Sequence, residues 1–191
     1  MRRTLAALVF VAVAIAILSG CRTKESGGTP PPASAAGPQS AELGWVEQTP
    51  PTGPALVFRV HRFAVTTTGW AADVGIENRT SVAWQLATDR VAVEQSFGVM
   101  LFATGDLDEV ERRGRDGDLP GLRPAQMFKP SLPERLAPGG RWRATVSAQG
   151  PLAAGRYLRV VFGPLSAEGD PPEGMPDDFV WITDHAYLLR S

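Results

Sequence analysis

Hydrophobic and polar residues alternate with a period of two in several short stretches after residue 44. In one of them Leu56, Phe58 and Val60 share a face, and in the next Trp70 and Val74 do. Alternation of this kind predicts half-buried strands, and turn residues separate the stretches. The predicted strands cover residues 56–61, 70–77, 82–86, 91–93, 97–102, 141–146, 157–162 and 179–189. Seven or eight short strands predict an all-β domain built as a β-sandwich.

One stretch, residues 103–133, lacks this alternation and is long for a loop in a compact domain. Asp106 is a suitable N-cap for a short helix, which Gly114 would end. The remainder contains four prolines and is expected to be irregular. The sequence therefore predicts one long, partly helical loop insertion. We expect the sandwich to fold without residues 104–132, because loop closure costs little free energy.

The N-terminus has a different pattern. Arg2 and Arg3 precede an apolar run over residues 5–18, and Ser19 and Gly20 lead into Cys21. The run is shorter than the roughly 20 residues that a membrane-spanning helix needs. It has the length of the apolar region of a signal peptide.

The segment that ends in Leu18-Ser19-Gly20-Cys21 closely resembles bacterial lipoprotein signals. The resemblance implies that residues 1–20 are removed and that the Cys21 thiol carries a diacylglyceryl lipid of the palmitate type. This covalent lipid is the only cofactor-like group that we expect. A plain cleaved signal is the alternative, and it would leave Cys21 as a free thiol in an exported protein.

Residues 21–43 form the lipidated N-terminus and a linker rich in Pro, Gly, Ala and Ser, which we expect to be disordered. The globular domain is predicted to cover residues 44–191. Without Arg2 and Arg3, 17 of the 19 basic side chains remain beside 20 acidic ones, a net charge of −3. That charge gives no indication of nucleic-acid binding. Because Cys21 is the only cysteine, the domain contains no disulfide.

A second resemblance concerns the later strands. Pro138-Gly139 is a turn before a strand, and Gly155-Arg156-Tyr157 opens the next one. With residues 74–80 before Trp84, this layout is similar to bacterial immunoglobulin-like domains and to the intracellular proteinase inhibitor domain of bacilli. It implies an immunoglobulin-like sandwich in which Tyr157 forms a tyrosine corner. Arg159 stands where antibody-type domains have a cysteine.

Four patterns indicate possible chemistry, and each has a simpler interpretation. Asp184 and His185 are neighbours, but adjacent strand residues point to opposite faces. Carboxylates gather in the insertion, yet arginines lie among them and would compete with calcium. The five tryptophans suit a sugar-stacking surface, although most lie in alternating runs that are typical of core packing. Asn78-Arg79-Thr80 matches a glycosylation sequon and also suits a turn after a strand.

The sequence thus predicts a non-enzymatic, lipid-anchored cell-envelope protein whose domain binds an envelope protein. The predicted anchors of that interaction, in the insertion, are Leu119, Leu122, Met127 and Phe128. Two alternatives stay open: a carbohydrate- or peptidoglycan-binding module, and an accessory, inhibitor-like partner of an envelope hydrolase. Arg22 is not the aspartate associated with inner-membrane retention, so a two-membrane organism would carry the protein on its outer membrane. In a one-membrane organism it would lie on the outer face of the cytoplasmic membrane.

Overall fold

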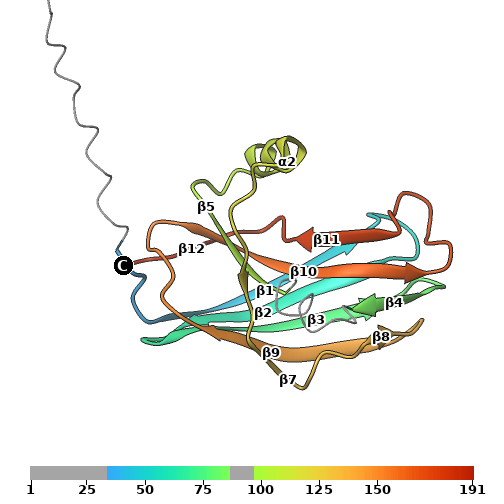
Figure 1. The fold of residues 1–191 in the computed structure, drawn as a ribbon, viewed down its shortest axis with the longest axis horizontal. Coiled ribbons are helices and arrows are strands. Elements are labelled where there is room, and N and C mark those ends of the chain that lie inside the picture. The colour runs from blue at the N-terminus through green and yellow to red at the C-terminus, as the bar shows by residue number, and fades with distance from the viewer. Residues whose placement is uncertain (1–33, 87–96) are drawn as a thin grey trace, which may run out of the picture. The chain divides into compact units, whose positions relative to one another are not determined.

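A computed structural model describes residues 34–86 and 97–191 of the chain. Two antiparallel sheets pack face to face and enclose one hydrophobic core (Figure 1). This arrangement confirms the all-β sandwich predicted from the alternating pattern. The predicted strand 91–93 lies outside the described residues, as do the signal peptide and Cys21.

The five-stranded sheet has the order β1-β2-β3-β9-β7. Its strands are β1 (Gln39–Thr49), β2 (Leu56–Val65), β3 (Gly69–Asn78), β9 (Arg141–Gln149) and β7 (Met127–Lys129). The turn between β2 and β3 is closed by a hydrogen bond of 2.8 Å from the Thr66 amide to the Gly69 carbonyl. The sheet buries one face and leaves the other in solvent, as the alternation in β9 illustrates.

The seven-stranded sheet is organised around its longest strand, β10 (Tyr157–Glu168). Along one side of β10 lie β5 and β4, extended by β6 and β8, and along the other side lie β12 and β11. The bounds of these strands are Ala83–Leu86 (β4), Gly98–Phe102 (β5), Arg123–Pro124 (β6), Arg135–Leu136 (β8), Asp178–Ile182 (β11) and Tyr187–Leu188 (β12).

The core contains the side chains that alternation assigned to the inner faces. Phe58 on β2 packs between the two sheets, with Phe162 of β10 at 5.1 Å and Trp181 of β11 at 5.3 Å between ring centroids. Trp84 of β4 and Trp142 of β9 are also buried. Burial of these large rings supplies most of the driving force for packing the sheets together.

A polar turn after β3 ties the two sheets at one end. The fully buried Asn78 donates from its side-chain amide to the carbonyls of Val82 and Leu136 and accepts from the amide and hydroxyl of Thr80. The Thr80 hydroxyl in turn accepts from the indole N–H of Trp84 at 3.1 Å. The sequon is therefore a structural turn, and its asparagine side chain has no access to solvent.

Several boundaries differ from the sequence prediction. The domain begins before residue 44, because Gln39 is the first residue of β1 and pairs with Val65. Small and polar residues had suggested a linker there, but backbone pairing with β2 needs no large side chain. The strand count is twelve among the described residues, more than the expected seven or eight. Strand β1 and the very short strands β6, β7 and β8 give little sequence signal, and the predicted strand 179–189 is divided into β11 and β12.

The tyrosine corner expected at Tyr157 is absent. Its hydroxyl makes no hydrogen bond to any other residue that the structure describes, and its ring lies against Gly105 instead. A Cβ atom added at Gly105 would come within 2.8 Å of the Tyr157 ring. Tyr157 therefore packs on the stem of the insertion rather than pinning a crossover.

Candidate functional site

The insertion of residues 103–133 leaves the seven-stranded sheet after β5 and carries the one α-helix of the described residues, α2 (Leu107–Asp116). Asp106 caps its N-terminus as predicted, with its side chain accepting from the Asp108 amide at 3.1 Å. The helix passes through Gly114 and ends at Gly117, which has a left-handed backbone with φ of 71°. Gly114 was the wrong end because a glycine inside a helix costs only about 1 kcal/mol.

Helix α2 stands clear of the two sheets (Figure 1), and Val110 is its only buried residue. Its other side chains reach solvent or lie at the surface of the stem. A helix that buries one side chain gains about 1.5–3 kcal/mol from burial. Its position therefore depends on how its ends are held.

The N-terminal stem of α2 is held by Arg159 of β10. This arginine is fully buried, and its guanidinium donates to the Gly105 carbonyl at 2.9 Å, the Thr183 carbonyl at 2.6 Å and the Asp184 carbonyl. Its centre lies 5.7 Å from the centroid of the Phe102 ring, a cation–π geometry. Burial lowers the pKa of Arg159. Arg159 thus joins the insertion to the β11–β12 loop.

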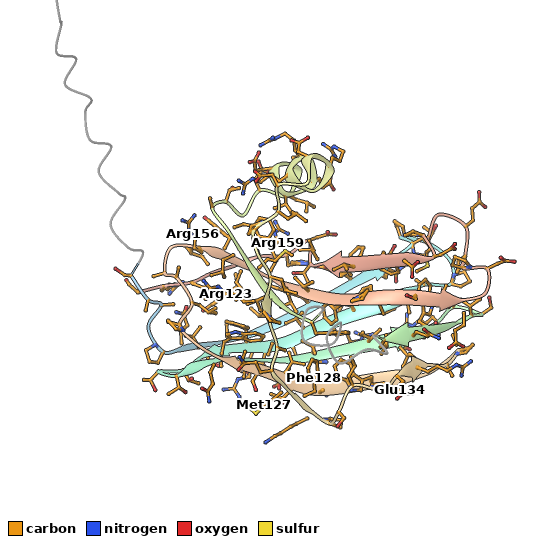
Figure 2. The ribbon with its side chains drawn as sticks, in the orientation of Figure 1. Arg123, Met127, Phe128, Glu134, Arg156 and Arg159 are labelled. Atoms are coloured by element: carbon orange, nitrogen blue, oxygen red, sulfur yellow. The ribbon has the colours of Figure 1, made fainter. Side chains whose placement is uncertain are left out.

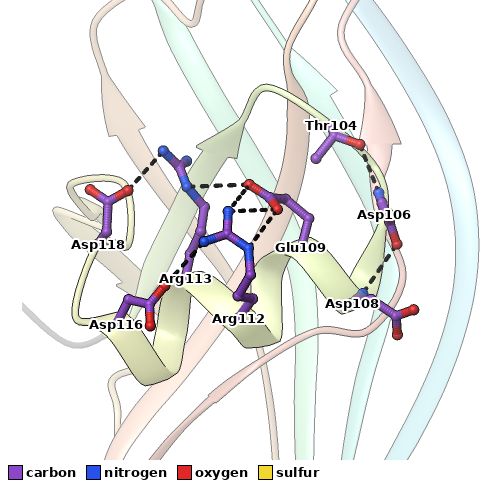
Figure 3. A network of polar contacts seen from close by, with 8 residues as sticks. All are labelled: Thr104, Asp106, Asp108, Glu109, Arg112, Arg113, Asp116 and Asp118. Atoms are coloured by element: carbon purple, nitrogen blue, oxygen red, sulfur yellow. Dashed lines mark hydrogen bonds and ion pairs between the residues drawn. The ribbon is translucent and has the colours of Figure 1, made fainter.

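The exposed surface of α2 carries charges of both signs that are paired with one another (Figure 3). Arg112 contacts Glu109 at 2.8 Å and Asp116 at 3.0 Å, and Arg113 contacts Glu109 at 3.7 Å and Asp118 at 3.0 Å. The pKa of Arg112 is raised, above all by its hydrogen bond to Glu109. Of the carboxylates that suggested a metal site, Glu109, Asp116 and Asp118 are thus paired with arginines, and Asp106 caps the helix.

The four predicted anchor residues fall into different environments, and Figure 2 labels two of them, Met127 and Phe128. Met127 is 49% exposed on edge strand β7, and Leu119 and Leu122 are half-buried and line two shallow hollows beside the insertion. Phe128 instead faces the core, with ring centroids 6.0 Å from Phe97 and 6.4 Å from Trp142. Phe128 is therefore a packing residue, because β7 pairs with β9 and turns it inward.

Part of the insertion is thus sandwich. Strand β6 pairs with β5 of one sheet, β7 pairs with β9 of the other, and the buried Ala125 lies between them. Removing residues 104–132 would take an edge strand from each sheet, contrary to the expectation that this whole stretch is dispensable. The freely presented part is the shorter segment that contains α2.

The carboxylate partner of His185 is Glu47 rather than Asp184. The Glu47 side chain, only 6% exposed, accepts from His185 Nδ1 at 2.7 Å and from Trp181 Nε1 at 2.8 Å. Burial, followed by the nearby Glu47 charge, raises the pKa of Asp184. No sequence signal links Glu47 to a histidine 138 residues away. The pair joins β1 to the β11–β12 loop.

The tryptophans do not form an exposed sugar-stacking platform. Trp70, Trp84 and Trp142 are buried, whereas Trp45 and Trp181 are partly buried. The Trp45 ring is stacked on His185 at 5.5 Å, and the Trp181 ring on Phe58. The ring face of Trp45 that packs on His185 and the face of Trp181 that packs on Phe58 are therefore not open for a sugar ring to stack on.

Sequence reasoning also missed a group of arginines on the solvent face of the five-stranded sheet. Arg59, Arg79 and Arg141 converge on Glu77, and Arg143 stands beside them. The sequence signal was available, since alternation places Arg59, Glu77, Arg141 and Arg143 on outward positions of neighbouring strands. Only the register of β2, β3 and β9 brings them together.

There is no cluster of three or more His, Cys, Asp or Glu side chains suited to a metal ion within residues 34–86 and 97–191. Over the same residues no helix has the length and apolar character to cross a bilayer.

No protein-family model, curated protein or solved structure matches the chain.

Proposed function

We propose that this chain is a non-enzymatic, lipid-anchored cell-envelope protein whose sandwich presents α2 to another envelope protein. The anchor part of the proposal rests on the sequence: a positive start at Arg2 and Arg3, a short apolar run, and Cys21 directly after small residues. An acylated Cys21 would hold the domain at the membrane by two acyl chains, which suffice for stable anchoring.

The observation that carries the binding role is the form of α2. It is a helix with one buried side chain, a capped N-terminus and a rigid attachment through Arg159. A segment kept outside the core but held at its base by a buried cation is suited to presenting a surface. Long structured loops in compact domains are commonly functional.

The charge pattern on α2 supports a protein partner. Paired charges of both signs steer an encounter and set specificity rather than supply bulk affinity. Exposed apolar area beside the helix, contributed by Met127 and by the half-buried Leu119 and Leu122, would supply the contact that excludes water. The carboxylates of α2 that pair with arginines are poorly suited to act as general acids or metal ligands.

In-cell photocrosslinking tests this role. A photoreactive amino acid placed at Arg115, whose side chain is 69% exposed, should capture one partner reproducibly. The matched control carries the same group at Thr67, an exposed residue of the β2–β3 turn on the other sheet. A partner that is captured equally from both positions, or from neither, would show that α2 is not the binding surface.

The anchor is tested by fractionation. Cys21→Ser should move the protein from the detergent-extractable membrane fraction to the soluble envelope fraction. The unfolding midpoint of the domain should stay unchanged, since the first strand of the sandwich begins at Gln39. A Cys21→Ser protein that is still extracted only with detergent would contradict lipid anchoring. The partner experiment is independent of this result.

A further inference from the structure

The solvent face of the five-stranded sheet contains a hollow of about 360 Å³ that the proposed role of α2 does not use. It lies over the middle of β2, the C-terminal end of β3 and the start of β9, on the sheet opposite the one to which α2 is attached. Its polar lining consists of Arg59, His61, Glu77, Arg79, Arg141 and Arg143.

Gly75 creates the space in this hollow. In the strand register Gly75 lies between Arg59 of β2 and Arg143 of β9. A Cβ atom at position 75 would stand 3.9 Å from the Arg59 Cβ and 4.0 Å from the Arg143 Cβ. The two arginines therefore flank an open gap, about two inter-strand spacings wide, whose floor is backbone.

The side chains that line the hollow carry mostly positive charge. Glu77 binds Arg141 at 2.8 Å, Arg79 at 3.0 Å and Arg59 at 3.5 Å. Hydrogen bonds from Arg79 and Arg141 lower the pKa of Glu77 to about 2, although its burial acts in the opposite direction. One carboxylate thus holds three guanidinium groups in place and neutralises one of them.

Arg143 has no such partner. It is exposed on β9 and makes no ion pair or side-chain hydrogen bond with any residue in the described ranges. Four arginines and one glutamate, with His61 taken as neutral, leave the lining with a net charge of +3. Clustered like charges repel one another, and an anion bound among them would relieve that repulsion.

We propose that this hollow binds a phosphate group of a small ligand, with Arg143 and Arg59 as its ligands on either side of Gly75. Guanidinium groups bind phosphate oxygens in pairs, and a phosphate ester offers up to two negative charges to a lining with three positive ones. A carboxylate would offer one. The hollow is several times larger than a phosphate, so the group belongs to a larger molecule, either a soluble phosphate ester or a lipid headgroup.

Binding to the full-length protein in non-ionic detergent is measured by isothermal titration calorimetry. The probes are inorganic phosphate, glycerol 1-phosphate and acetate at constant ionic strength. Phosphatidylglycerol in the same detergent micelles is the headgroup arm. We expect saturable binding of at least one phosphate probe and weaker binding of acetate.

Two variants address the site, and one serves as the control. Arg143→Gln removes the unpaired cation, and binding should weaken about tenfold. Gly75→Val keeps every charge and fills the gap, so binding should be lost while the thermal melt stays cooperative. Arg62→Gln removes an exposed charge on the same sheet, at a residue that follows His61 but does not line the hollow, and should change little.

A phosphate probe that binds saturably, weakens with Arg143→Gln and is retained by Arg62→Gln supports the proposal. If Gly75→Val fails to fold, comparing the phosphate affinities of Arg143→Gln and Arg62→Gln still tests the proposal. The proposal is overturned by no saturable binding of any phosphate probe, by acetate binding as tightly as phosphate, or by equal weakening in Arg143→Gln and Arg62→Gln. None of these results depends on whether α2 captures a partner.

Discussion

Glu47 Oε1 and His185 Nδ1 lie 2.7 Å apart, although 138 residues separate them in the chain. The same carboxylate also accepts from the Asp184 and His185 amides, each at 3.0 Å, and from the Trp181 indole N–H. Four donors therefore converge on one buried acid that joins β1 to the β11–β12 loop. The contact connects the two sheets.

Glu47→Gln should destabilise the domain by about 3 kcal/mol, because an amide has one acceptor oxygen and turns its NH₂ group toward donors. Urea unfolding followed by tryptophan fluorescence measures the change. Glu42→Gln is the matched control on the same strand, where a side chain 80% exposed faces only Arg62 at 3.6 Å, and its effect should stay below ~0.5 kcal/mol. Equal unfolding midpoints for the two variants would contradict this role of Glu47.

Much of the fold was predictable, because a large apolar side chain at every second position predicts which face of a strand is buried. Leu56, Phe58 and Val60 on β2 are all buried as the pattern predicts. Strand β1 gave a weaker signal, since its small and polar residues are stabilised by backbone pairing with β2. The two- and three-residue strands are too short for any periodicity.

The candidate sites show the same division. The N-cap at Asp106 was predictable because capping is local. The partner of His185 was not predictable. The sequence suggests the adjacent Asp184, whereas the actual partner, Glu47, comes close only when the two sheets pack together. The arginine hollow needs the register of three strands, which the sequence leaves open until their pairing is known.

Glu77 should make stability depend on pH. Its folded-state pKa of about 2 lies below its ordinary 4.5, so its contribution is present above pH 4.5 and is lost as the pH falls toward 2. The full shift corresponds to ~3 kcal/mol. Arg79 and Arg141 are 50% and 75% exposed, so solvent screening leaves about half of it.

The measurement compares wild type with Glu77→Gln by urea unfolding at pH 6 and pH 3. The difference in unfolding free energy should be about 1–2 kcal/mol at pH 6 and should shrink by more than half at pH 3. Glu168→Gln is the control for a single exposed partner, since among the arginines that the structure describes that carboxylate pairs with Arg135 alone. A difference that stays constant between the two pH values would show that Glu77 is not held ionised by its arginines.

The two tyrosines of the chain should respond differently to loss of the hydroxyl. Tyr157→Phe should change the unfolding free energy by less than ~0.5 kcal/mol, because the hydroxyl has no described partner. Tyr187→Phe should cost about 1 kcal/mol, because its hydroxyl donates to Gln39 Oε1 at 3.2 Å. A larger loss of unfolding free energy for Tyr157→Phe would contradict the absence of a tyrosine corner.

Replacing residues 106–118 with a short Gly-Ser linker should separate the presented part of the insertion from the structural part. This change removes α2 and the burial of Val110 but keeps Gly105, which accepts from Arg159, and both strands β6 and β7. We expect a cooperative urea transition, with stability lowered by about 1.5–3 kcal/mol for the lost apolar burial.

The comparison is the longer replacement of residues 104–132. It removes β6, β7, the buried Ala125 and the ring contacts of Phe128 with Phe97 and Trp142, so it should abolish cooperative unfolding. In cells, the shorter replacement should also lose the partner that a photoreactive group at Met127 captures from the otherwise unchanged chain. If the shorter replacement unfolds, α2 belongs to the core. If it folds and the same partner is still captured, the partner binds beside α2 and the helix is not the recognition element.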